Sequence, residues 1–339
     1  MKKIFRTTYL ALLLIAGLSC NNDPMPDAPK GKYPILFRCS DETRAVATVD
    51  SMKADTDGFD VYAYFETNTD EEVLFEKNVK WNESEGMWLY EDIEYWIPGA
   101  TYWFKAVYPK GIATTVDNDD SFSIKLSVAE TPSDIDFLIA ENGPITSVEG
   151  YSETVDLQFE HVLTSVGLNI WREGVKHQND KMRIKKVTLG NICKSGAYST
   201  ATHAWTYNSG DKLTVEVDNT DKLTDSDNIG AVIVKDDGTL DAGGSKPASP
   251  FGQMMLLPQT LDASNSVSLK IVYQLKRNNA ADWEEAELET VLPYSTWKAG
   301  NRYTYNVVLS SVTDITIYYI QTKVDPWGTP QVGGTVIIK

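Results

Sequence analysis

The sequence predicts an all-β fold, and three observations support this prediction. Residues that favour strands, chiefly Tyr, Trp, Val and Thr, are abundant, and aromatic side chains alone make up 11% of the 339 residues. Short segments of alternating polarity recur roughly every ten residues, with Gly, Pro, Asn and Asp between them. No window of ordinary helix length keeps an apolar period of 3.6 residues. This pattern is typical of β-sandwiches.

The N-terminus has the features of a secretory leader that ends in a lipidation site. Three cations in the first six residues precede an apolar run over residues 9–18, which is too short to span a bilayer. Cys20 follows in a sequence that resembles a lipobox, although Gly17 stands where leucine is usual. We expect a signal peptide over residues 1–19 and a lipidated polar tether over residues 20–32. An ordinary signal peptide is the alternative.

The first series of predicted strands is clearest at residues 58–65. Apolar residues at the odd positions from 59 to 65 alternate there with residues that carry polar groups at the even positions. The other strands expected in this series cover residues 33–39, 74–81, 87–97, 101–109, 121–126 and 136–140.

A second series of predicted strands begins near residue 155. Residues 231–234 are apolar at every position, which predicts a strand buried on both faces. The other expected strands cover residues 155–163, 165–171, 183–190, 212–217, 253–258, 267–276, 285–292, 300–309, 313–324 and 334–339.

The chain length suggests two domains. A loop rich in Gly, Ser and Glu over residues 142–153 is the best position for a boundary between them. We therefore expect an N-terminal β-sandwich domain over residues 33–150 and a C-terminal one over residues 151–339.

The chain is strongly acidic, with a net charge of −17, and loss of the leader removes three more positive charges. Binding to phosphate backbones requires a basic face, so no nucleic-acid partner is expected. Besides Cys20, the only cysteines are Cys39 and Cys193. They could form a disulfide in an oxidising compartment or remain free thiols, and their spacing does not decide between these alternatives.

Motifs for catalysis or cofactor binding are absent from the sequence. His161, His177 and His203 lack a metal-ligand spacing such as H-E-x-x-H, and neither a P-loop nor a G-x-S-x-G elbow occurs. Two acidic loops, residues 117–120 and 225–228, could hold calcium but lack the EF-hand glycine and glutamate, and we interpret them as solvated turns. We expect no enzyme activity, no cofactor and no metal site.

A series of segments after the lipobox follows an order that carries a family signal. They are Thr43-Arg44-Ala45, Gly58 to Tyr64, a hairpin with Trp88, Trp96 and Pro98, Tyr102 to Pro109, Asp136 to Ala140, Phe159 to Val166, Trp297 to Tyr305 and Val324 to Trp327. Each is a strand pattern and not a chemical site. Their order and spacing over nearly the whole mature chain resemble the fimbrillin family, the subunits of type V pili and their Mfa-like relatives.

This resemblance implies a fold of two transthyretin-like β-sandwich domains and a route of assembly. Family precursors travel to the outer membrane as lipoproteins, and an arginine-specific, trypsin-like protease cuts them after the first strand. Removal of that strand opens a groove, which a strand of a neighbouring subunit fills. The partners implied are other pilus subunits, the protease, the outer membrane through the lipid, and a host or bacterial surface ligand.

Residues near the N-terminus fit the first two steps of this route. The removable strand would be residues 34–39, and Arg44 follows it in a polar stretch that a protease could reach. Cleavage is therefore expected between Arg44 and Ala45. The alternatives are a permanent edge strand and an ordinary loop arginine. The face of the removable strand that would fill the groove carries Ile35, Phe37 and Cys39.

The C-terminal segment, residues 313–339, would supply the donor strand. An added strand gains main-chain hydrogen bonds at an exposed sheet edge and places alternate side chains in pockets. Alternatively, these strands simply complete the second sandwich. The expected donor side chains are Ile315, Ile317, Tyr319, Val336 and Ile338.

The nine tryptophans raise a second hypothesis, a surface-anchored glycan-binding lipoprotein. Such a protein should gather aromatic rings on one exposed face, whereas most of these residues alternate within strands and are expected to pack internally. A non-polymerising tip or anchor component of a pilus is a further alternative. We favour a structural pilus subunit at the cell surface.

Overall fold

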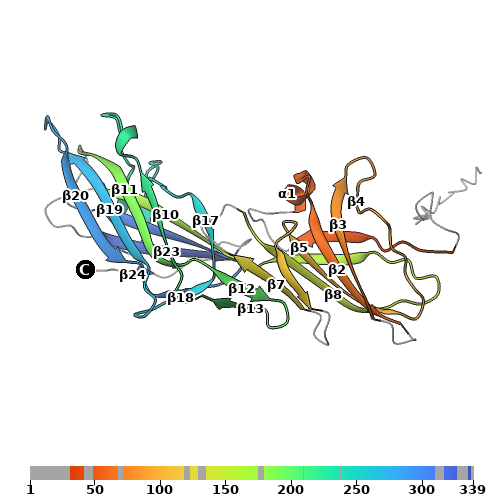
Figure 1. The fold of residues 1–339 in the computed structure, drawn as a ribbon. Coiled ribbons are helices and arrows are strands. Elements are labelled where there is room, and N and C mark those ends of the chain that lie inside the picture. The colour runs from red at the N-terminus through yellow and green to blue at the C-terminus, as the bar shows by residue number, and fades with distance from the viewer. Residues whose placement is uncertain are drawn as a thin grey trace, which may run out of the picture.

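The computed structural model describes residues 31–41, 49–67, 72–117, 123–128, 135–174, 179–208, 210–236, 239–309, 317–326 and 335–336. Nearly all of the regular structure is β, which confirms the predicted fold class. The molecule is elongated, with the early strands at one end and the late strands at the other (Figure 1).

Seven strands close into a ring at one end of the molecule, which we call the N-terminal barrel. Around the ring they are β1 (Phe37–Asp41), β4 (Met87–Leu89), β3 (Glu72–Asn82), β2 (Phe59–Glu66), β5 (Thr101–Tyr108), β8 (Leu138–Thr146) and β9 (Val155–His161). Helix α1 (Val49–Ala54) contacts β1 and β3. The sequence did not predict this helix because six residues are too few to show a helical period.

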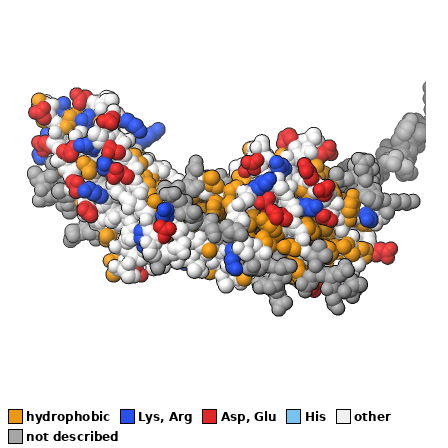
Figure 2. All heavy atoms as spheres, in the orientation of Figure 1, with side chains coloured by type: hydrophobic (Ala, Val, Ile, Leu, Met, Phe, Trp, Pro, Cys, Tyr) orange, Lys and Arg blue, Asp and Glu red, His pale blue; other side chains and the backbone are white. Residues whose placement is uncertain are grey.

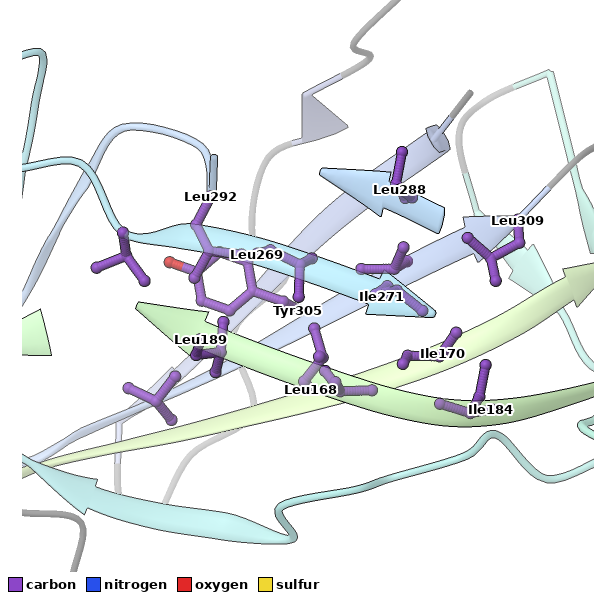
Figure 3. Packing of buried hydrophobic residues seen from close by; sticks show 14 of the residues in the cluster. Leu168, Ile170, Ile184, Leu189, Leu269, Ile271, Leu288, Leu292, Tyr305 and Leu309 are labelled. Carbon is purple, nitrogen blue, oxygen red and sulfur yellow. The ribbon is translucent and has the colours of Figure 1, made fainter. Parts of the chain in front are cut away.

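Two sheets at the other end of the molecule form an open sandwich, which we call the C-terminal sandwich. One sheet has the order β16 (Leu240–Asp241), β15 (Ala231–Val234), β10 (Thr164–Glu173), β22 (Asn301–Leu309), β23 (Ile317–Pro326) and β24 (Thr335–Val336), and β17 (Gln253–Leu256) also pairs with β10. The other has the order β14 (Lys212–Asp218), β11 (Lys181–Cys193), β19 (Ser268–Lys276) and β20 (Glu284–Val291). Both sheets pack on one buried cluster (Figure 3).

A smaller sheet joins the barrel to the sandwich, and we call it the junction sheet. The hairpin of β6 (Ala113–Asp117) and β7 (Ser123–Val128) leaves the barrel, and β7 pairs with β12 (Gly196–Ser199), which pairs in turn with β13 (Ala204–Tyr207). Nearby, the buried Lys105 ammonium contacts Glu141 at 2.9 Å and Thr200 at 3.2 Å. A separate pair, β18 (Gln259–Leu261) and β21 (Ser295–Trp297), completes the strands.

Two sequence predictions about the boundary region are corrected by the strand pairing. The sequence places residues 142–146 in a loop, whereas β8 continues through Thr146 and pairs there with β5. The sequence places β9 with the second series, whereas β9 pairs with β1 and β8 in the barrel. The chain changes sheet at residues 162–163, between β9 and β10. The domain division at residue 150 itself stays a prediction.

Local predictions succeeded where alternation was strong. In β2, Phe59 and Val61 lie in the barrel core, and Tyr62 and Tyr64 lie in a separate buried cluster on the other face, so the predicted alternation is confirmed. By contrast, only three of residues 87–97 form β4, because the chain then turns to pair with residues 33–35. Ile233 in β15 is 48% exposed, so burial of that strand on both faces was a wrong prediction.

Candidate functional site

Strand β1 occupies a distinctive position in the barrel. It pairs in parallel with β9 along its whole length, from Phe37 opposite Val155 to Asp41 opposite Phe159. Its antiparallel pairing with β4 consists of Phe37 opposite Trp88. Parallel partners cannot be joined by a tight turn, and here 118 residues separate the paired positions 38 and 156. β1 therefore closes the ring although it is distant in sequence from both of its neighbours, β4 and β9.

The inward face of β1 fills the core of the barrel. Ile35 and Phe37 are buried, as the sequence predicted, and the Phe37 ring lies 5.6 Å from the ring of Tyr90 and 5.9 Å from that of Phe104. The Tyr90 hydroxyl donates a hydrogen bond of 2.7 Å to the Ile35 carbonyl. We call the space that these side chains fill the β1 slot.

Cys39 follows on the same face and is half-buried. Burial raises the pKa of its thiol, which disfavours the reactive thiolate. Cys193 is buried on β11, and neither cysteine forms a disulfide. The structure therefore favours the second of the two alternatives that the sequence left open.

The outward face of β1 carries Arg38, whose guanidinium binds both carboxylate oxygens of Asp156 on β9, one of them at 2.7 Å. Both side chains are more than half exposed, so this ion pair fixes the register of the two strands but adds little stability. Arg38 lies within a paired strand, which makes it a poor protease site compared with an arginine in a loop.

The expected processing residues lie outside the described residues. Arg44 and Ala45 fall between the end of β1 at Asp41 and the start of α1 at Val49, and Cys20 precedes the described part of the chain. Their roles stay predictions.

The C-terminal candidates belong to an edge of the C-terminal sandwich. Ile317 and Tyr319 are in β23, whose backbone pairs with β22 from end to end. Val336 is in β24, where the described residues 335 and 336 pair with Gln321 and Ile320 of β23. Ile315 and Ile338 lie outside the described residues. Of the two predicted donor strands, β23 thus has the longer described ladder.

A surface hollow of about 950 Å³ lies beside β3 and residues 89–92. Trp81 lines it, but the Lys53 ammonium sits 4.6 Å from the centre of its ring and Trp88 packs edge-on at 5.4 Å. A smaller hollow of about 460 Å³ beside residues 219–229 has no aromatic lining. Among the described residues no tryptophan is exposed, so the tryptophans of this part of the chain do not form the exposed face expected of a glycan binder.

Two of the three histidines lie in the described part of the chain, and each is close to a carboxylate. His161 Nδ1 lies 2.6 Å from a carboxylate oxygen of Asp136, and both side chains are buried. Burial raises the pKa of Asp136, against the opposing effect of His161. His203 is exposed and lies 3.9 Å from Glu141. His177 lies outside the described residues.

In the second acidic loop, residues 225–228, three side chains accept hydrogen bonds from other groups of the protein. Asp225 accepts a hydrogen bond from the Trp283 indole, Asp227 accepts one from the Thr224 amide, and Asn228 accepts one from the Met182 amide. Over the described ranges, no three His, Cys, Asp or Glu residues converge as metal ligands would. Residues 118–120 of the first acidic loop lie outside these ranges. The described helices also include none with the length and apolarity needed to cross a membrane.

Comparison with known proteins identifies relatives in family and in fold. A family model described as fimbrillin-like matches residues 43–327. A fimbrial protein from Bacteroides vulgatus has a similar structure, with a TM-score of 0.62 and 18% identity over 87% of this chain and 99% of that one. A Parabacteroides distasonis protein, described as a candidate for cell adhesion, gives a TM-score of 0.51 and 12% identity over 89% of this chain and 100% of that one. No curated protein matches the sequence.

Proposed function

This chain belongs to the fimbrillin-like family, and we propose that it is a lipoprotein precursor of a pilus subunit that is cut after Arg44 and polymerises by strand exchange. The family match and the fold support a structural subunit of a cell-surface pilus that serves adhesion, with no catalytic role. The observation that carries the proposed mechanism is the position of β1, which closes the barrel by pairing with the distant strand β9.

Removal of β1 would have a different effect from removal of an ordinary edge strand. Because the barrel is a closed ring, loss of β1 exposes the backbone N–H and C=O groups of β9 along residues 155–159. Unpaired strand edges are templates for pairing with another chain. The same loss uncovers the β1 slot, so an incoming strand finds both a hydrogen-bonding edge and apolar pockets.

The β1 slot favours an apolar strand with large side chains at alternate positions. Burial of Ile35 and Phe37 contributes roughly 1.5–3 kcal/mol for each side chain, and an occupant must replace that contribution. The segment after β23 fits this requirement, because Val336 and Ile338 are apolar and two residues apart. Its strand β24 lies at the edge of the sandwich sheet, so a donor released from there leaves the ladder of β23 with β22 in place.

In this proposal the lipid on Cys20 is a temporary membrane anchor of the precursor. It holds the precursor at the outer membrane and is lost with residues 20–44 when the protease acts. A chain in which Arg44 is never cut would keep Cys20 as a permanent anchor, which is the behaviour expected of a pilus base or anchor component.

The test is cleavage of the purified precursor by an arginine-specific protease, followed by N-terminal sequencing and negative-stain imaging. We expect a new N-terminus that reads Ala45-Val46-Ala47 and the appearance of filaments. The Arg44→Gln precursor should stay uncut and monomeric. The matched control is Arg38→Gln, which removes an arginine from β1 and should be cut at Arg44 and polymerise as the wild type does.

Two results would contradict the proposal. One is filaments built from subunits that still begin at acylated Cys20. The other is an Arg44→Gln precursor that polymerises at the wild-type rate.

A further inference from the structure

The end of the barrel that points away from the C-terminal sandwich carries an exposed apolar patch. Ile97 is 43% exposed and Val148 is 62% exposed, and Pro98 is exposed beside them. We call these three residues the pole patch. Val148 is the most exposed large hydrophobic side chain among the described residues. Exposed apolar side chains that cluster on a soluble protein indicate a binding surface.

Hydrogen bonds fix the two loops that form the pole patch. The Ser147 amide donates to the Ala100 carbonyl at 2.9 Å, and the Gly99 amide donates to the Ser147 carbonyl at 2.8 Å. The buried Ser147 hydroxyl donates to the Ile97 carbonyl. A surface held in this way loses little conformational entropy when it binds, so its burial translates more fully into affinity.

The pole patch is continuous with one end of the β1 slot. The Trp96 amide donates to the Tyr33 carbonyl at 3.0 Å, so the residue before Ile97 pairs with the chain that leads into β1. The Trp96 ring then packs on Tyr151 at 4.9 Å, beneath the loop that carries Val148. The end of the β1 slot that begins at Ile35 therefore lies next to the loops of the patch.

The opposite end of the β1 slot leads toward the junction sheet. There Asp41 pairs with Phe159, and the chain beyond β9 reaches Val162, whose carbonyl accepts a hydrogen bond of 2.7 Å from Trp205 next to the sandwich. The body of another molecule whose strand fills the slot would be obstructed at that end by this chain's own sandwich. At the pole, the described residues place no part of the sandwich in its way.

We infer that the pole patch docks against a second copy of this chain, namely the copy whose donor strand fills the β1 slot. This inference rests on the proposed function. The cut chain, residues 45–339, keeps 24 Lys and Arg residues against 44 Asp and Glu residues, a net charge of −20, so its copies repel one another. The side chains of the pole patch are uncharged, so they can meet a second copy without placing like charges in contact. The patch thus makes a second contact beside the inserted strand and sets the rate and stability of assembly.

The test compares polymer growth of the cut wild-type chain with that of cut Val148→Glu and Ile97→Glu chains, by light scattering and negative stain. Each variant should grow about tenfold more slowly or worse, because a loss near 1.4 kcal/mol at each junction reduces association tenfold. Val148→Ser, which removes apolar surface without adding charge, should have a smaller effect in the same direction. The matched control is Ile135→Glu, a comparably exposed side chain at 51% that precedes β8 at the junction end of the barrel and should leave growth unchanged.

The outcomes separate this inference from the proposed function. Wild-type growth of both Val148→Glu and Ile97→Glu chains overturns the docking role of the pole patch and leaves strand exchange standing. A cut wild-type chain that forms no polymer overturns the proposed function instead. Thermal unfolding of each variant before cleavage verifies that the barrel is intact, as expected for side chains on its surface.

Discussion

The two ends of this molecule differ in whether their sheets have free edges. The N-terminal barrel is a closed ring, whereas both sheets of the C-terminal sandwich are open and end in exposed strands such as β14 and β20. Loss of β20 would only make β19 the new edge. Loss of β1 turns a ring without edges into a groove with one strand missing. In the proposed function, the barrel is the part that accepts a strand and the sandwich is the part that donates one.

The two ends also differ in the side chains that make up their cores and surfaces. The barrel core is rich in aromatic rings, among them Phe59, Trp88 and Phe104, which pack edge to face. The sandwich core is mainly aliphatic. On the face seen in Figure 2, hydrophobic side chains gather over the barrel, and charged side chains of both signs cover the outer sandwich. Ion pairs such as Lys270 with Glu287 link neighbouring sandwich strands and keep their edges soluble.

The largest effect should follow from removal of the donor. Deletion of residues 333–339 takes away β24 and the apolar residues after it, while β23 keeps its full ladder with β22. We expect a folded chain that is cut by the protease but cannot polymerise. Size-exclusion chromatography after cleavage measures this result, and normal filaments from the truncated chain would place the donor elsewhere.

A smaller and more local effect should come from the core face of β1. Phe37→Ala should lower the free energy of unfolding of the precursor by about 3–5 kcal/mol, because it empties an aromatic pocket in a closed ring. Hydrogen exchange should rise in β9, the partner of β1.

The matched variant is Leu288→Ala in the open edge strand β20, which should cost about 2–5 kcal/mol without raising exchange in β9. If both variants raised exchange in β9 equally, the two ends would not open independently and the contrast between them would fail.

The smallest effect concerns the outer face of β1. Hydrogen bonds from Arg38 hold the pKa of Asp156 below its ordinary value of 3.8. Because the folded pKa is the lower one, the contact stabilises the pair of strands above pH 3.8 and this contribution is lost as the pH falls below it. Protection of β1 amides should therefore be weaker at about pH 3 than at about pH 6. Asp156→Asn should reduce that difference, and an unchanged difference would assign it to other carboxylates.

Local sequence patterns accounted for much of the fold because alternation and turn residues act over a few positions. They located β2, β5 and β19 and identified Ile35 and Phe37 as core residues. They missed β12 and β13, which have four residues each. β12 is held by pairing with β7 across the junction, and β13 is held by pairing with β12. They also failed for Ile233, since an apolar run does not reveal whether a second layer covers it.

The sequence by itself determined the all-β class, the position of most strands and the family to which the chain belongs. Only the tertiary structure decided which strands become neighbours, above all that β1 lies parallel to β9 and closes a ring. The physical reason is that alternation along a strand is set by its own backbone, whereas a parallel partner more than a hundred residues away is chosen by the packing of the whole barrel. The pole patch has the same origin, because its residues come from two loops that only the fold brings together.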